Sequence, residues 1–130
     1  MKANEIGRVI KARLLASAEV TALVGQKIFP IVAVQSTPAP YVTYCRTSVK
    51  PGYTKDRKSL TDTATVEVTI YAPTYEQSIA IMNAVDNALQ GFRGTLEDVE
   101  VDRIREINSE EDFQDGAYLQ NLVFEIDINN

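Results

Sequence analysis

The chain has 130 residues, of which 45% are hydrophobic and 24% are charged, and its formal net charge is −5. The length predicts one domain spanning residues 1–130, and the composition excludes disordered, collagen-like and coiled-coil classes. The acidic balance argues against sequence-specific recognition of nucleic acid, because binding to the phosphate backbone depends on basic side chains.

The N-terminal third predicts helical structure followed by an extended segment. Asn4 is a candidate N-cap for a first helix, in which apolar residues recur at positions i, i+3, i+4 and i+8 from Ile6. A second short helical segment is expected from Ser17 onward. Residues 27–34 favour a short edge strand, since Pro30 has no N–H to give to a neighbouring strand.

The middle of the chain predicts two strands joined by a long polar loop. A strand is expected at residues 41–49, and apolar residues alternate cleanly over residues 63–72. Between them, residues 50–62 carry turn-forming and basic side chains, which predicts a long exposed hairpin loop. One apolar and one polar face on each strand favours an antiparallel sheet.

A helix follows the second of these strands directly. Pro73 ends the strand, and Thr74 with Gln77 has the spacing of a capping box. Apolar residues then recur at helical spacing from Ile81 to Leu89 and predict one buried stripe, which Gly91 terminates.

The last third predicts two more strands around an acidic loop. Residues 99–107 favour a strand whose alternation slips between Val101 and Ile104, which suggests a bulge. Residues 108–116 are expected to form an acidic loop, and residues 118–128 a final strand. The predicted fold class is α+β: an antiparallel sheet of four to five strands, with an N-terminal helix and a central helix packed on one face, in the order α-β-β-β-α-β-β.

Charge is unevenly distributed along the chain. Residues 50–58 hold four basic and one acidic side chain, a net charge of +3, whereas residues 97–115 hold two basic and nine acidic side chains, a net charge of −7. Clusters of this kind are usually solvated or face a partner. The candidate contact residues in the two clusters are Lys50, Tyr53, Lys55, Arg57, Lys58, Glu110, Glu111, Asp112 and Asp115.

Known catalytic and ligand-binding patterns are missing from the sequence. The chain contains no histidine, which excludes Ser-His-Asp and Cys-His catalysis and the common zinc sites. The acidic residues do not have the order of an EF-hand loop, and no glycine-rich phosphate-binding motif occurs, so no cofactor or metal is expected. Cys45 is expected to be an unreactive, partly buried thiol. No apolar run reaches the ~18 residues of a membrane span, so we expect a soluble, cytoplasmic protein.

The segment "EVTALVGQKIFPIVAVQSTPAPYVTYCRTS" resembles the N-terminal part of phage tail-completion proteins, which are related to head-to-tail joining (tail terminator-like) proteins of siphophages and prophages. The matching features are a "VTALVG" helical segment, an "IFP" step and a "PYVTY" strand. The strand and helix over residues 65–89 also fit this family, so the resemblance covers most of the chain.

The resemblance implies a structural assembly protein, not an enzyme, that completes the tail or joins head to tail. Such proteins form rings, commonly hexamers and in some cases only on assembly, which contact the tail tube protein and head connector proteins. The expected locations are the host cytoplasm during assembly and then the virion tail or head–tail junction. Two alternatives remain open: a small binding or regulatory domain encoded by a phage or mobile element, and a metal-dependent enzyme using the acidic residues.

Overall fold

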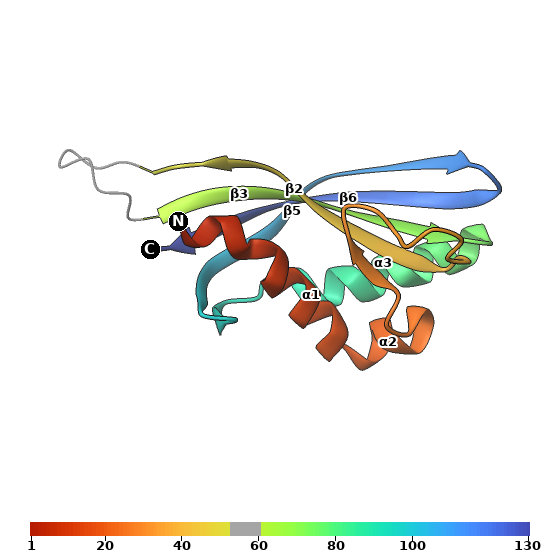
Figure 1. Cartoon of the computed structure of the whole chain (residues 1–130), viewed down its shortest axis with the longest axis horizontal. Helices are drawn as coiled ribbons and strands as arrows, with labels where there is room; N and C mark the ends of the chain where they lie inside the picture. The colour runs from red at the N-terminus through yellow and green to blue at the C-terminus, as the bar shows by residue number, and fades with distance from the viewer. Residues whose placement is uncertain (53–60) are drawn as a thin grey trace.

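A computed structural model describes residues 1–52 and 61–130 and shows three α-helices packed on one face of a long, twisted sheet (Figure 1). The N-terminal elements are a 3₁₀ turn η1 (Lys2–Glu5), helices α1 (Ile6–Ala16) and α2 (Ala18–Val24), and strands β1 (Ile28–Pro30) and β2 (Tyr41–Lys50). The remaining elements are β3 (Thr61–Ala72), α3 (Tyr75–Leu89), β4 (Gly94–Leu96), β5 (Val99–Gln114) and β6 (Ala117–Asn129). The α+β class is therefore confirmed.

The sheet has six strands in the order β1-β2-β3-β6-β5-β4 among the residues described. The predicted count of four to five strands, and the predicted order of elements, are wrong because β4 was not anticipated. That strand has only three residues, too few to give a recognisable alternation. The sheet is also not wholly antiparallel, since β1 pairs in parallel with β2 at the edge. Residue patterns do not encode the direction of so short a pairing.

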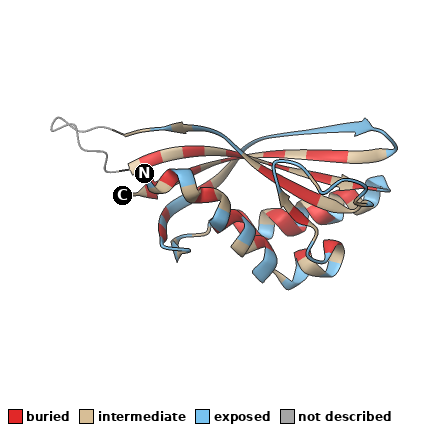
Figure 2. Cartoon of the chain, in the orientation of Figure 1, coloured by how far each residue is buried: buried red, intermediate tan, exposed pale blue. Residues whose placement is uncertain are grey.

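The core lies between the sheet and the helices (Figure 2). The predicted alternation of β3 is confirmed, because Ala64, Val66, Val68, Ile70 and Ala72 are all fully buried. Helix α3 covers β3 and β6 and contributes a buried stripe, and α1 covers β2. The opposite face of the sheet is polar, as expected for a sheet with one solvated side.

The helix starts agree with the predictions in two cases of three. Ser17 caps α2, accepting a hydrogen bond from the backbone N–H of Val20, and Thr74 caps α3 through the N–H of Gln77. The expected cap at Asn4 is wrong because η1 precedes α1. The Asn4 Oδ1 instead accepts a hydrogen bond from Arg46 on β2, with an N–O distance of 2.5 Å.

The predicted acidic loop over residues 108–116 is wrong. These residues complete β5, which runs to Gln114 and pairs with β6 up to a tight turn at Asp115 and Gly116. Both faces of this hairpin are largely exposed, so its side chains do not alternate in polarity and resemble a loop. The predicted bulge near Val101 is confirmed, since the β5–β6 register shifts between Val101 and Arg103, and a second shift occurs between Glu106 and Asn108.

Candidate functional site

Beyond the second bulge, β5 and the start of β6 form a hairpin that we call the arm, residues 107–120. All eight β5 residues in the arm, 107–114, are exposed. Figure 1 shows the arm at one end of the sheet, with the described ends of β2 and β3 at the other. The arm contains Glu110, Glu111, Asp112 and Asp115, and therefore all four of the acidic candidate residues.

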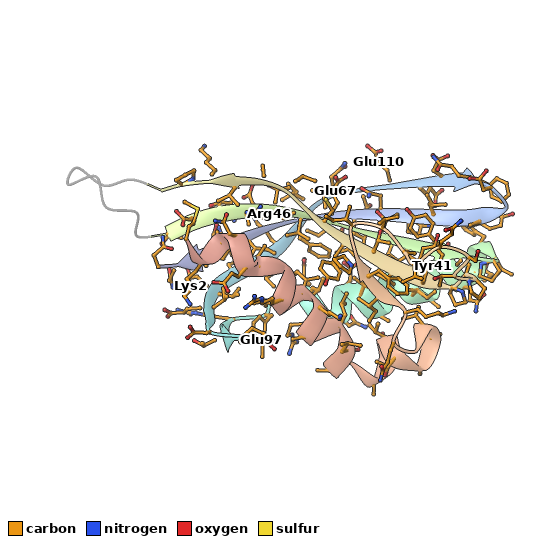
Figure 3. All side chains as sticks on the ribbon, viewed as in Figure 1. Lys2, Tyr41, Arg46, Glu67, Glu97 and Glu110 are labelled. Carbon is orange, nitrogen blue, oxygen red and sulfur yellow. The ribbon has the colours of Figure 1, made fainter. Side chains whose placement is uncertain are left out.

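These acidic residues divide between the two faces of the arm. Glu110 and Asp112 pair with Asn121 and Leu119, which places them on the polar face of the sheet, away from the helices. In Figure 3, Glu110 projects from that face, as does Glu67 of β3. The Asp112 carboxylate accepts a hydrogen bond from the backbone N–H of Phe113 (2.7 Å), and Asp115 has a φ of 51° in the turn.

Glu111 lies on the helix side of the arm and attaches it to α3. Its Oε2 accepts hydrogen bonds from the Tyr75 hydroxyl (2.9 Å) and the Gln120 amide (3.1 Å). The Gln120 amide also donates to the Ser78 hydroxyl oxygen (3.2 Å). The hydrogen bond to Glu111 and the negative charge of that carboxylate raise the pKa of Tyr75. Glu111 therefore positions the arm, whereas Glu110 and Asp112 face away from α3.

An aromatic cluster at the arm, which the sequence analysis did not identify, extends these contacts. The Tyr118 ring makes edge contacts with Phe113 and with Tyr75, at centroid distances of 4.8 and 6.0 Å. Phe113 remains 55% exposed. An open hollow of about 290 Å³ beside these rings is lined by Tyr75, Glu111, Asp112, Tyr118 and Leu119. The three aromatic residues come from α3, β5 and β6, so no local sequence pattern could have grouped them.

A second exposed apolar region follows β1. Ile31, Val32 and Val34 are 72%, 73% and 67% exposed, in the segment that leads to β2. Ile31 has a φ of 66°, which is unfavourable for a β-branched residue. Such strain is concentrated at functional sites, and exposed apolar side chains that lie together often mark contact surfaces.

Of the basic candidates, Lys50 lies at the opposite end of the sheet from the arm. Lys50 is exposed and ends β2, whereas the predicted loop assignments of Tyr53, Lys55, Arg57 and Lys58 lie outside the residues that the structure describes. Through β3 and β6, Lys50 lies in line with Arg103 of β5. Glu110 is seven residues further along β5, about 23 Å at the usual rise of a strand. Lys50 and the acidic residues of the arm therefore do not meet within one chain.

A pair of carboxyl groups lies at the base of the arm. Asp86 of α3 faces Glu106 of β5, and one oxygen of each, Oδ1 and Oε1, is buried without any other hydrogen-bond partner among the described residues. Burial, together with the hydrogen bond and negative charge of Asp86, raises the pKa of Glu106 to about 7.

Within residues 1–52 and 61–130, no group of three or more Cys, Asp or Glu side chains is arranged to hold a metal ion. Over the same residues, no helix is both long and apolar enough to cross a bilayer.

The fold is of the α+β class, and its exposed features are the acidic arm, the aromatic cluster beside it and the apolar segment after β1. The sequence matches the family of tail completion protein gp17 over residues 8–128. The chain belongs to this family, and its role is structural, in phage tail assembly. The family suggested by the sequence motifs is thus confirmed.

Solved structures show the same fold. A chain from the virion of a native gene transfer agent (GTA) particle is similar with a TM-score of 0.81 and 18% identity, over 93% of this chain and 92% of that chain. The gp17 protein of bacteriophage SPP1 is similar with a TM-score of 0.58 and 16% identity, over 98% of this chain and 91% of that chain. A search of curated proteins gave no match.

Proposed function

We propose that this protein completes the phage tail as a hexameric ring that meets the tail tube protein on one side and head connector proteins on the other. The observation that carries this proposal is the family match over residues 8–128, combined with a net charge of +3 over residues 50–58 and of −7 over residues 97–115. A cyclic ring needs two different, complementary patches on each subunit. The acidic arm and the basic residues at and after the end of β2 supply such patches.

The proposed role is mechanical and involves no enzymatic step. The arm offers exposed carboxylates and aromatic rings on a rigid hairpin, which suits docking between proteins. Charged patches mainly accelerate association and fix its register. Assembly would take place in the host cytoplasm, and the protein would then remain in the virion tail or at the head–tail junction, in keeping with the similar chain in the GTA virion.

Loss of the protein should leave heads and tails unjoined in a lysate, and supplying it should restore joined particles, as counted by electron microscopy. The triple variant Lys55→Glu, Arg57→Glu, Lys58→Glu should fail to restore joining although its circular dichroism is that of a folded chain. Normal particles with this variant would contradict the contact role of these basic residues.

Native mass spectrometry tests the ring separately. A ring that forms with increasing concentration, or on addition of tails, supports the proposal. A chain that stays monomeric even on tails would favour a small binding domain instead.

A further inference from the structure

Two stretches of strand edge are free, one on each side of the sheet. On β2, strand β1 pairs only with Val42, Thr43 and Tyr44, so the outer edge of residues 45–50 has no strand beside it among the described residues. On β5, strand β4 pairs only with residues 99–101, so the outer edge of residues 107–114 is likewise free in the described part of the chain. An open edge is a template for another strand.

The two free edges carry opposite charge. The edge of residues 45–50 contains Arg46 and Lys50 and no acidic residue, whereas the edge of residues 107–114 contains Glu110, Glu111 and Asp112 and no basic residue. Two copies of the same edge would therefore repel each other, and unlike edges attract. This pattern disfavours a symmetric pairing of identical edges and favours a head-to-tail contact.

We propose that neighbouring copies of this chain join by strand pairing, with the free edge of β5 in one copy against the free edge of β2 in the next. This inference rests on the proposed ring and specifies its subunit contact. Successive neighbours β2, β3, β6 and β5 are antiparallel, so β2 and β5 run in opposite directions. A second copy in the same orientation therefore continues the sheet with an antiparallel pair and keeps its helices on the same face.

The short edge strands leave room for this pairing. When Lys50 is placed opposite Glu110, Ser48 lies opposite Asp112 and, past the bulge at Thr47, Cys45 lies opposite Gln114, so that polar-face residues meet polar-face residues. The neighbour's β1 then lies beyond the turn of the arm, and β4 of the first copy lies beyond Lys50 of the neighbour. Neither short strand obstructs the contact.

The same alignment brings the two exposed apolar regions together. The Ile31 backbone N–H donates to the Tyr44 carbonyl oxygen at 2.7 Å, which fixes Ile31 beside the β2 edge. In the neighbouring copy it would lie next to the turn of the arm, close to Phe113. Ile31 and Phe113 are 72% and 55% exposed in the single chain, so the contact would remove apolar surface from water at both.

The pairing also implies a stagger between copies. Within one sheet, Lys50 lies in line with Arg103 of β5. Moving the contact from Arg103 to Glu110 shifts each copy by seven residues, about 23 Å along the strands. A sheet that closes on itself requires such a stagger and a tilt of its strands, so this contact is compatible with the proposed ring.

Charge exchange tests this contact without changing the helix face. The arm variant carries Glu110→Lys and Asp112→Lys, and the edge variant carries Ser48→Glu and Lys50→Glu. Each variant alone should associate at least tenfold more weakly than the wild-type chain in sedimentation equilibrium. An equimolar mixture should recover association, because every contact in an alternating ring is again between opposite charges. A chain with all four changes should recover it as well.

Hydrogen exchange distinguishes strand pairing from a contact made by side chains alone. In the assembled wild-type chain, amides in both free edges should exchange at least tenfold more slowly than in the dissociated chain. Unchanged exchange in an assembled ring, or no recovery in the mixture, would overturn strand pairing while leaving the ring itself in place. A wild-type chain that completes tails but never contacts a second copy would overturn both the ring and its contact.

Discussion

The helix-covered body and the arm are parts of one sheet, yet their side chains are distributed in opposite ways. In the body, β3 and β6 bury one side chain in two against the helices, and most of the residues between them are polar. In the arm, every β5 residue is exposed, although the strand is paired with β6 along its length. The comparison indicates that the body supplies the stability of the fold, whereas the arm leaves its side chains exposed, as the proposed contact role requires.

Truncation of a phenylalanine in each region should separate the two roles most strongly. Phe124 is fully buried at the centre of β6, so Phe124→Ala should lower the free energy of unfolding by about 3 to 5 kcal/mol. Phe113→Ala in the arm should cost less than about 1 kcal/mol, because that ring is 55% exposed. Urea denaturation of the two variants measures both values. Equal losses would mean that the arm belongs to the stabilising core.

The same contrast explains how far the sequence could predict the structure. Where one face is buried, as from Ala64 to Ala72, the period of two identifies the strand and its buried side. Thr74 was recognisable as a cap, and Ser17 as the start of a helical segment, because helix starts depend on local interactions. The predicted cap at Asn4 was wrong because the partner of this side chain, Arg46, is distant in the sequence.

The candidate site was predictable only in part. The excess of acidic residues was evident, but residues 108–114 have no buried face and so gave no strand pattern. Pairing with β6 forms that strand, and pairing is a tertiary property. The Tyr75–Tyr118–Phe113 cluster and the Asp86–Glu106 pair join separate elements, which no spacing in one segment can reveal.

The carboxyl pair between α3 and β5 should make stability depend on pH. The pKa of Glu106 is raised to about 7 in the folded chain, above its ordinary value near 4.5. The folded state therefore binds more protons than the unfolded state between these values, and stability should fall as pH rises from 5 to 8. Partial access of solvent limits the loss to about 1 kcal/mol.

Substitution of Glu106 tests this dependence. Glu106→Gln should remove most of the decrease, because an amide can donate to Asp86 without ionising. The matched control, Glu100→Gln, changes an exposed residue of the same strand and should keep the wild-type slope. Urea midpoints at several pH values give the comparison, and a slope that persists in Glu106→Gln would assign the dependence to other groups.

The smallest expected effect concerns the attachment of the arm to α3. Glu111→Gln removes the negative charge that raises the pKa of Tyr75, so that pKa should fall toward its ordinary value near 10. NMR titration of the labelled tyrosine ring carbon follows this group directly. Because the pair is exposed, the urea midpoint should not change measurably. A Tyr75 pKa that does not move would show that the hydrogen bond is absent in solution.

Shortening the arm tests most directly whether assembly depends on it. Replacing residues 112–119 by Asn-Gly joins the cross-strand partners Glu111 and Gln120 through a two-residue turn and leaves the body intact. We expect a folded chain with a nearly unchanged melting temperature that no longer joins heads to tails in a lysate lacking the wild-type protein. Normal joining by the shortened chain would contradict the assignment of contact to the arm.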